Sequence, residues 1–167
     1  MSRARDIETP SSEVRDWGSR PARGEAHVEL EDYRHAASLR AAIRVFLRRG
    51  ENVARAAGLT PQRQLLLLMI KGAPNGSERA TITQLVERLQ LRQNTVTELV
   101  SRAEDAGLIV REPAPTDRRS VHLRLSADGE RRLAQTVTAL RGDREHLVRM
   151  IAQQGGAQAS RGHGDAA

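Results

Sequence analysis

The feature that most constrains the fold is a pair of amphipathic segments separated by very few residues. Apolar residues recur at spacings of three and four, which is typical of helices: Leu85, Val86 and Leu89 in the first segment, and Val96, Leu99, Val100 and Ala103 in the second. The link through Gln90 and Leu91 has the length of a helix-turn-helix link. Two short apolar runs follow, at roughly 108–112 and 121–125, and predict a β-hairpin. A helix-turn-helix followed by such a hairpin is a winged helix.

Before this unit, the pattern predicts a long helix from about residue 28 to residue 58. Its apolar stripe consists of Leu39, Ile43, Phe46, Leu47, Val53, Ala54 and Ala57. Gly50 interrupts the pattern without ending it, and Gly58 is a good stop signal. A helix of about 30 residues is long for a globular domain. Its stripe needs a long surface to pack against, and a partner subunit is a natural choice.

A short helix is predicted next. Thr60 is the expected N-cap, with Pro61 at the first helical position, where a missing N–H costs nothing. The run from Leu65 to Ile70 is apolar on all sides, which predicts a central, buried helix. Gly72 and Pro74 end it, and a turn is expected at Asn75-Gly76.

The final periodic segment begins after Ser126, a candidate N-cap, and is expected to reach about residue 154. Its apolar residues are Leu133, Val137, Leu140, Leu147, Val148 and Ile151, and Gly142 marks a point where the helix can kink or split. Residues 1–26 are polar and aperiodic, so we expect a disordered basic arm. The Gly- and Ala-rich residues 155–167 are expected to form a disordered tail.

The charge balance favours a polyanionic partner. The formal net charge is +6, the sequence pI is about 11.1, and Lys71 is the only lysine. Nucleic acid and a membrane surface both fit this excess, and a coding bias towards solvated arginines would also explain it. Only Trp17, Tyr33 and Phe46 are aromatic, which argues against single-stranded nucleic acid, because stacking platforms need aromatic rings.

Several classes of function are disfavoured by what the sequence lacks. With no cysteine there are no disulfides and no thiolate metal sites. The histidines show no metal-ligand spacing, and no phosphate-binding glycine loop or hydrolase motif occurs, so we expect neither a metal, a cofactor nor an enzyme. No apolar run reaches the roughly 20 residues needed to span a bilayer. We therefore expect a cytoplasmic protein without membrane partners.

The segments AGLTPQRQLLLLMIKG and TITQLVERLQLRQNTVTELVSRAEDAGLIVREPAPTDRRSVHLRLSADGE resemble the MarR family of winged-helix transcriptional regulators. The likeness covers roughly residues 30 to 150 and rests on the order of the pieces, including the D-R-R of the hairpin tip and the LSADG before the last helix. It implies a mainly α fold with a small β-wing. It also implies one domain, residues 27–154, in which 27–58 and 126–154 are dimerisation helices and 59–125 form the DNA-binding part.

The resemblance also implies partners. Family members are homodimers that bind double-stranded DNA, with recognition helices in the major groove and wings in the flanking minor groove. Many release DNA when a small aromatic or anionic effector binds. We therefore expect a transcriptional regulator, with repression as the favoured sign. A non-specific or architectural protein that binds double-stranded DNA is the alternative.

This sequence departs from the family in three ways. Arg92 stands at the start of the recognition helix, where many members have a serine cap. Glu98 occupies a recognition position that is often basic; an acid there repels phosphate, but it can accept from cytosine N4 or pair with Arg102. The C-terminal region is short, without the further full helix that many members have after the one starting near Ser126.

The candidate DNA contacts follow from the outward face of the second helix and from the wing. With the resemblance they are Thr83, Arg92, Gln93, Asn94, Thr95, Thr97, Glu98, Ser101, Arg102, Arg111, Asp117, Arg118 and Arg119. Gln and Asn suit adenine, Thr suits a thymine methyl group, and Arg suits guanine or phosphate. Without the resemblance, the pattern fits an ordinary solvated helix face equally well.

In members of the family, an aspartate in the wing pairs with the wing arginine. The resemblance therefore implies that Asp117 pairs with Arg119 and orients it. Arg119 would then enter the minor groove, while Arg118 or Arg111 contacts phosphates. Because adjacent strand residues point to opposite sides, the sequence leaves open whether Arg118 or Arg119 enters the groove. The plain alternative is a hydrophilic turn stiffened by proline.

Overall fold

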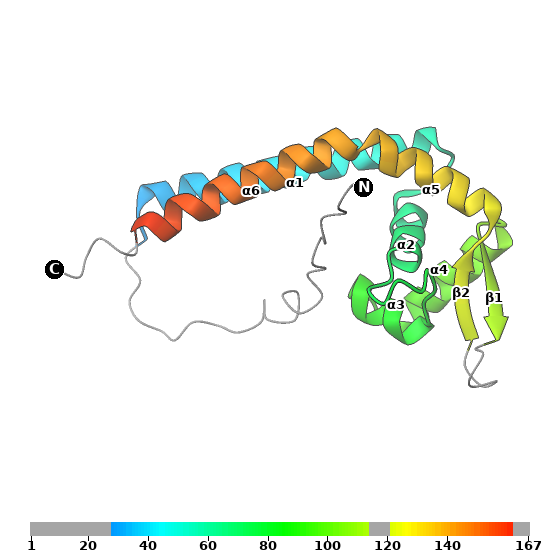
Figure 1. The fold of residues 1–167 in the computed structure, drawn as a ribbon. Coiled ribbons are helices and arrows are strands. Elements are labelled where there is room, and N and C mark those ends of the chain that lie inside the picture. Colours follow the sequence, from blue (N-terminus) through cyan, green and yellow to red (C-terminus); the bar gives the residue numbers. More distant parts are fainter. Residues whose placement is uncertain (1–27, 114–120, 162–167) are drawn as a thin grey trace, which may run out of the picture.

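The structure, a computed structural model, describes residues 28–113 and 121–161 (Figure 1). In chain order the elements are α1 (Leu30–Ala56), α2 (Pro61–Lys71), α3 (Ile82–Leu89), α4 (Gln93–Asp105), β1 (Ile109–Pro113), β2 (Val121–Leu125), α5 (Ala127–Ala139) and α6 (Arg141–Arg161). The predicted class, mainly helical with a small β-wing, is confirmed.

The junction between α1 and α2 follows from local chemistry. Gly58 has a φ of +71°, a left-handed conformation that glycine adopts without strain, and it lies just beyond the end of α1. Thr60 then caps α2 by accepting a bond from the Arg63 amide at 3.2 Å, with Pro61 in the first turn. Both signals were predicted, and Gly50 indeed leaves α1 unbroken.

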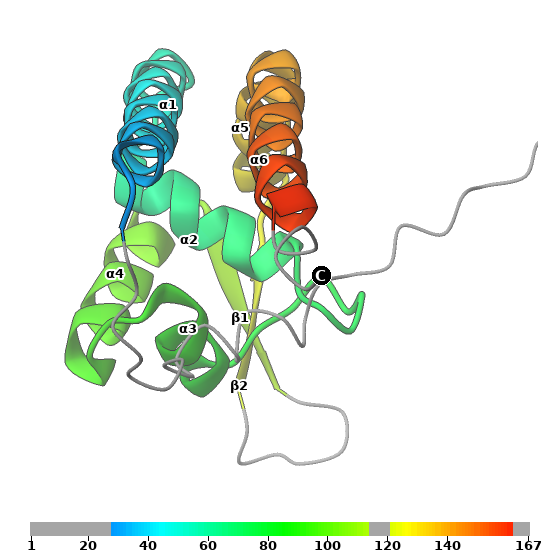
Figure 2. The ribbon, with the colours of Figure 1, turned by 90° about the vertical axis from the view of Figure 1, so that its left-hand side faces the viewer.

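Helix α2 lies at the centre of the molecule, between α1, α5 and α6 on one side and α3 and α4 on the other (Figure 2). Leu66, Leu67 and Ile70 are fully buried. The prediction that the whole apolar run is buried was wrong, because Leu65 and Leu68 keep 43% and 37% of their surface exposed. Their side of the helix has no covering element in the described chain.

The helix-turn-helix consists of α3 and α4. Thr81 caps α3 in a capping box, in which its side chain accepts from the Gln84 amide while Gln84 accepts from the Thr81 amide. The turn is made by Gln90, whose φ of 54° is left-handed. This conformation lets the chain turn sharply into α4. Because residues other than glycine rarely adopt it, Gln90 carries a modest backbone strain.

Strands β1 and β2 pair antiparallel in the register Ile109↔Leu125, Val110↔Arg124, Arg111↔Leu123, Glu112↔His122 and Pro113↔Val121. Ala80 forms an isolated bridge to Leu123 on the other edge of β2. Side chains alternate across the hairpin, so Ile109, Leu123 and Leu125 face the core and are buried. The hairpin is thereby fixed against the helix-turn-helix.

The C-terminal region differs from its prediction. Helix α5 ends at its C-cap Leu140, two positions before the suspected Gly142, and the Leu140 side chain is buried beside Gly50 of α1. A second helix, α6, then runs to Arg161. The expectation of a short C-terminal region without a further helix was therefore wrong. Once a helix is established, adding a residue costs far less than nucleation, so two glycines do not end it at residue 154.

Candidate nucleic-acid interface

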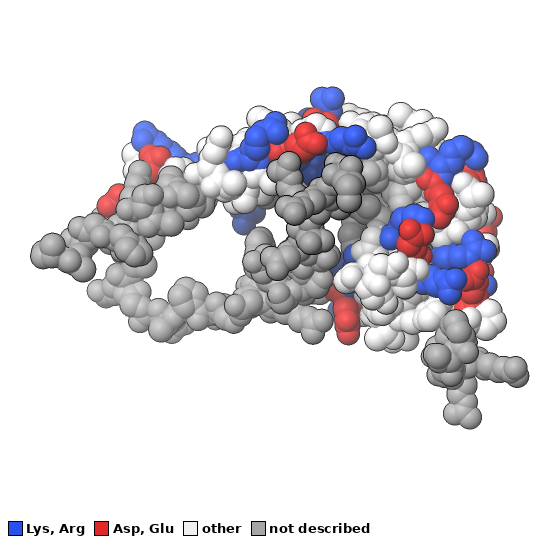
Figure 3. Space-filling model, in the orientation of Figure 1, with Lys and Arg blue, Asp and Glu red and all other residues white. Residues whose placement is uncertain are grey.

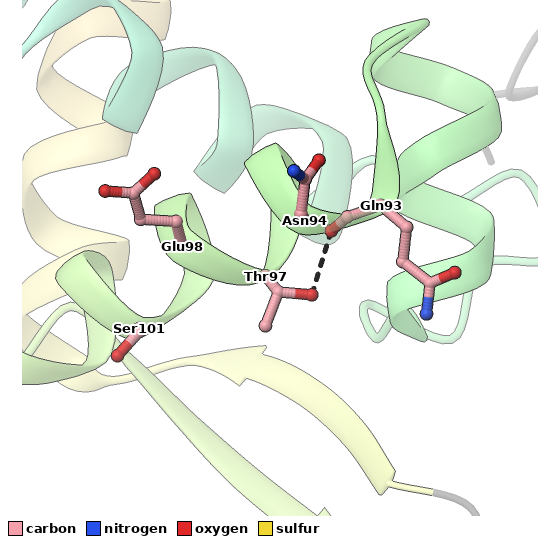
Figure 4. Close-up of a pocket in the computed structure, with 5 residues that line it drawn as sticks. All are labelled: Gln93, Asn94, Thr97, Glu98 and Ser101. Atoms are coloured by element: carbon pink, nitrogen blue, oxygen red, sulfur yellow. Dashed lines mark hydrogen bonds between the residues drawn. The ribbon is translucent and has the colours of Figure 1, made fainter.

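Helix α4 divides cleanly into a buried and an exposed face. Val96, Val100 and Ala103 are fully buried in the core. On the opposite side a shallow hollow is lined by five polar residues, as Figure 4 shows: Gln93, Asn94, Thr97, Glu98 and Ser101. All five were predicted as DNA contacts. The helix is held by its apolar face and presents a row of hydrogen-bonding groups to solvent.

The first turn of α4 is organised by its own side chains. Arg92 occupies the N-cap, is exposed, and makes no side-chain cap bond, as the substitution of arginine for serine predicted. Asn94 Oδ1 instead accepts from the Thr95 amide at 2.9 Å, so one of the free amides of the first turn is satisfied. The Thr97 hydroxyl donates to the Gln93 carbonyl oxygen at 2.9 Å (Figure 4). Both contacts restrict the side chains that face the hollow.

Glu98 and Arg102 form an ion pair one helical turn apart on the exposed side of α4. The pairing that the sequence suggested is present, and both side chains remain more than half exposed. The main chain at Arg102 is also held from α2, because Arg63 donates to the Arg102 carbonyl oxygen at 3.2 Å. The acid on the recognition face is thus partly neutralised before any partner arrives.

The remaining predicted residues are more scattered. Thr83 is exposed in the first turn of α3, and Thr95 is exposed on α4. Arg111 on β1 is engaged with Glu104 of α4, with 2.8 Å between Nε and a carboxylate oxygen. This ion pair ties the hairpin to the end of α4, so Arg111 would have to leave it to reach a phosphate. Asp117, Arg118 and Arg119 lie outside the described residues.

Sequence reasoning missed a charged cluster on the outer face of the hairpin. Arg124 forms an ion pair with Glu112, and Arg79 lies 3.5 Å from the same carboxylate. The hydrogen bond from Arg124 holds the pKa of Glu112 below its usual value. The strand alternation carried the signal, because Glu112 and Arg124 both fall on the face opposite the buried residues.

Arg88 was also missed, and it is structural. It donates to the Met69 carbonyl oxygen and, at 2.8 Å, to the Gly72 carbonyl oxygen, which closes the C-terminal end of α2. Burial lowers the pKa of its guanidinium group. The spacing of Leu85, Arg88 and Leu89 places Arg88 on the apolar side of α3, and that position was the available signal.

The charged surface is mixed and not uniformly basic. On the face seen in Figure 3, basic and acidic side chains lie next to one another over the strands and α5. Within the described ranges, no group of three or more His, Asp or Glu side chains is placed to hold a metal ion. None of the helices in those ranges is long and apolar enough to cross a membrane.

Comparisons with known proteins give a consistent result. The MarR family model matches residues 57–120. A putative transcriptional regulatory protein for the hcr operon of Thauera aromatica is 31% identical over 111 residues, which is 66% of this chain and 63% of the relative. The chain therefore aligns with somewhat less than two thirds of that relative's length.

Solved structures share the fold. AbsC, a MarR family transcriptional regulator from Streptomyces coelicolor, superposes with a TM-score of 0.60 at 18% identity, over 83% of this chain and 99% of AbsC. A mutant MarR from E. coli complexed with operator DNA gives 0.58 at 17% identity, over 80% of this chain and 98% of that one. The family model covers the helix-turn-helix and the wing, and these structures extend the likeness to the long helices. The chain is thus similar to MarR family regulators in sequence over residues 57–120 and in fold over most of its length.

Proposed function

We propose that this protein is a homodimeric transcriptional regulator that binds a pseudo-palindromic operator in double-stranded DNA. The observation that carries the proposal is the exposed face of α4. It offers side chains with the hydrogen-bonding chemistry of base recognition, on a helix whose other face is fixed in the core.

The chemistry of that face suits the major groove. An Asn or Gln carboxamide can bond the N6 and N7 edge of adenine with two hydrogen bonds, and a Thr methyl group can contact the thymine methyl. Gln93, Asn94 and Thr97 supply these groups. The E. coli MarR mutant of the same fold is described as complexed with operator DNA, and a MepR mutant from S. aureus as bound to an oligodeoxyribonucleotide. Both descriptions support double-stranded DNA as the partner.

Dimerisation is supported by apolar surface on the long helices, which lie side by side (Figures 1 and 2). In the single chain the exposed large apolar side chains there are Leu30, Tyr33, Val45 and Leu47 on α1, and Val148 and Ile151 on α6. Each of these side chains would stay in water in an isolated chain. A second copy would cover them and place two α4 helices about one DNA turn, ~10 bp, apart.

We further propose that a small aromatic or anionic molecule releases the protein from DNA. This proposal rests on the family resemblance, and the exposed Leu65 and Leu68 support it in one respect. They leave apolar surface on α2, the helix that contacts α1 and α5 as well as both helices of the helix-turn-helix. We expect the protein to repress transcription, because a dimer bound to a promoter would exclude RNA polymerase.

The test is DNase footprinting of the purified protein on the DNA flanking its own gene, followed by a salt series on the protected fragment. Any DNA-binding protein loses affinity steeply as the salt concentration rises. The slope of that dependence therefore does not distinguish a regulator from an architectural protein. A regulator retains a large preference for the protected site over random duplex, typically 10³-fold or more, whereas an architectural protein does not. No protected site at low salt would contradict the proposal.

A further inference from the structure

The hollow on the exposed face of α4 is lined by four neutral polar residues and one acidic residue. Of the five residues that line the hollow, Glu98 alone has a carboxyl side chain. A carboxylate facing a polyanion is repelled by every phosphate, so it weakens general affinity for DNA. A hydrogen bond from one particular base to the carboxylate would offset this repulsion.

Such a bond is set by the hydrogen-bonding capacity of a carboxylate, which is acceptor-only. In the major groove the donors are the 4-amino group of cytosine and the 6-amino group of adenine. Adenine also presents its N7 acceptor beside that amino group, which opposes a second carboxylate oxygen. Cytosine presents no acceptor at its major-groove edge. Glu98 therefore suits cytosine better than any other base.

Arg102 has the complementary chemistry. It lies one turn after Glu98, is paired with it, and is about equally exposed. Guanine presents two acceptors, O6 and N7, that match a guanidinium group. Because Arg63 fixes the main chain at Arg102 from α2, the pair is held on a rigid part of the molecule. A preformed Glu–Arg pair thus offers an acceptor beside donors, the complement of a C·G base pair.

We propose that Glu98 and Arg102 together read one C·G base pair in each half-site, with Glu98 accepting from cytosine N4 and Arg102 donating to guanine. The inference rests on the proposed function and adds a specificity determinant to it. With other base pairs, the carboxylate loses contact with water and finds either no donor or an adenine amino group that stands beside the N7 acceptor. Glu98 then acts as a repulsive element that penalises wrong sequences and random DNA.

The chain provides a matched control. Glu51 and Arg55 on α1 form the same kind of pair at the same spacing, 3.3 Å apart, with side chains 48% and 59% exposed. They lie far along the chain from the hollow. Glu51→Ala therefore removes the same charge and the same helical ion pair as Glu98→Ala, without touching the face of α4.

The experiment selects binding sites from a random pool of duplex DNA with wild type, Glu98→Ala and Glu51→Ala, after thermal melts have shown that each variant is folded. Wild type and Glu51→Ala are expected to select a C·G pair at one position of each half-site. Glu98→Ala is expected to lose that preference, by roughly 5- to 150-fold, the range for one good base contact, and to keep the others. Its affinity for random duplex should rise.

A second measurement changes the DNA and compares wild type with Glu98→Ala. The selected cytosine is replaced by 2-pyrimidinone, which lacks the 4-amino group, and wild-type affinity is expected to fall while Glu98→Ala is insensitive to the change. A wild-type protein that selects a site but is indifferent to this replacement would overturn the inference, as would a Glu98→Ala variant with the full C·G preference. A wild type that selects no sequence would overturn the proposed function together with the inference.

Discussion

The close contact between Gly129 and Leu108 leads to the sharpest stability prediction. Gly129 lies in the first turn of α5, and its amide is capped by the Ser126 hydroxyl at 3.1 Å. A Cβ atom added there would stand 3.0 Å from the Leu108 carbonyl carbon, far inside van der Waals contact of the carbonyl oxygen. That oxygen already accepts from the Ser126 amide at 3.0 Å. Neither partner is a flexible side chain, so Gly129→Ala must displace backbone.

The magnitude follows from opposing effects. Replacing a helical glycine by alanine gains up to about 1 kcal/mol. Overpacking a well-packed site costs about 1–3 kcal/mol or more, and losing the Ser126–Leu108 bond adds about 1 kcal/mol. We expect Gly129→Ala to lower the free energy of unfolding by about 1–3 kcal/mol, which for a chain of this size lowers Tm by roughly 2–10 °C.

The assay is thermal and urea unfolding monitored by circular dichroism, at one fixed protein concentration because association stabilises the folded state. Gly142→Ala is the matched control. Gly142 is helical and exposed, and an added Cβ would meet nothing within 4 Å, so this variant should gain about 0.5–1 kcal/mol. If Gly129→Ala is as stable as wild type or rises with the control, the argument from close contact is refuted.

Three further predictions concern other parts of the molecule. Arg88→Met leaves the Met69 and Gly72 carbonyl oxygens without their donor and should cost about 2 kcal/mol in urea unfolding; an unchanged midpoint would show that water replaces the guanidinium. The Lys71 ammonium bridges Glu130 at 2.7 Å and Glu78 at 2.6 Å, so the hydrogen bond with Glu130 raises the pKa of Lys71 and lowers that of Glu130. The Glu130 contribution to stability is therefore present above about pH 4.3 and lost as pH falls, and the Lys71 contribution is present below about pH 10.4 and lost as pH rises. Lys71→Met should be less stable than wild type between these limits, and an equal deficit at pH 3 would contradict the assignment. Val45→Asp, at a position 69% exposed in the single chain, should halve the mass measured by sedimentation without loss of helix, whereas an unchanged mass would place the dimer contact elsewhere.

Local signals were read correctly from the sequence, because each depends on a few neighbouring residues. The caps at Thr60 and Ser126 need only a hydroxyl oxygen near free amides of a first turn. The outward face of α4 also followed from spacing alone, since burying Val96 and Val100 fixes what lies opposite. These features position most of the candidate interface.

What the sequence did not predict depends on contacts between distant segments. Gly142 indicated a break in this region, but the sequence did not place it at Leu140, whose side chain packs beside Gly50, ninety positions earlier. Leu65 and Leu68 belong to an apolar run, yet their exposure depends on what the rest of the chain covers. Arg111 was predicted as a phosphate contact, but its pairing with Glu104 arises only when the hairpin packs against α4.

In the proposed function, the exposed face of α4 gives this protein its sequence preference. The most direct measurement compares wild type with Asn94→Ala on the selected operator and on a random duplex of equal length, at one salt concentration. Asn94 is exposed and lines the hollow, so the variant should fold normally. We predict that Asn94→Ala lowers operator affinity by about 1–3 kcal/mol while binding to random duplex is unchanged. An equal loss on both duplexes, or none on either, would contradict the account.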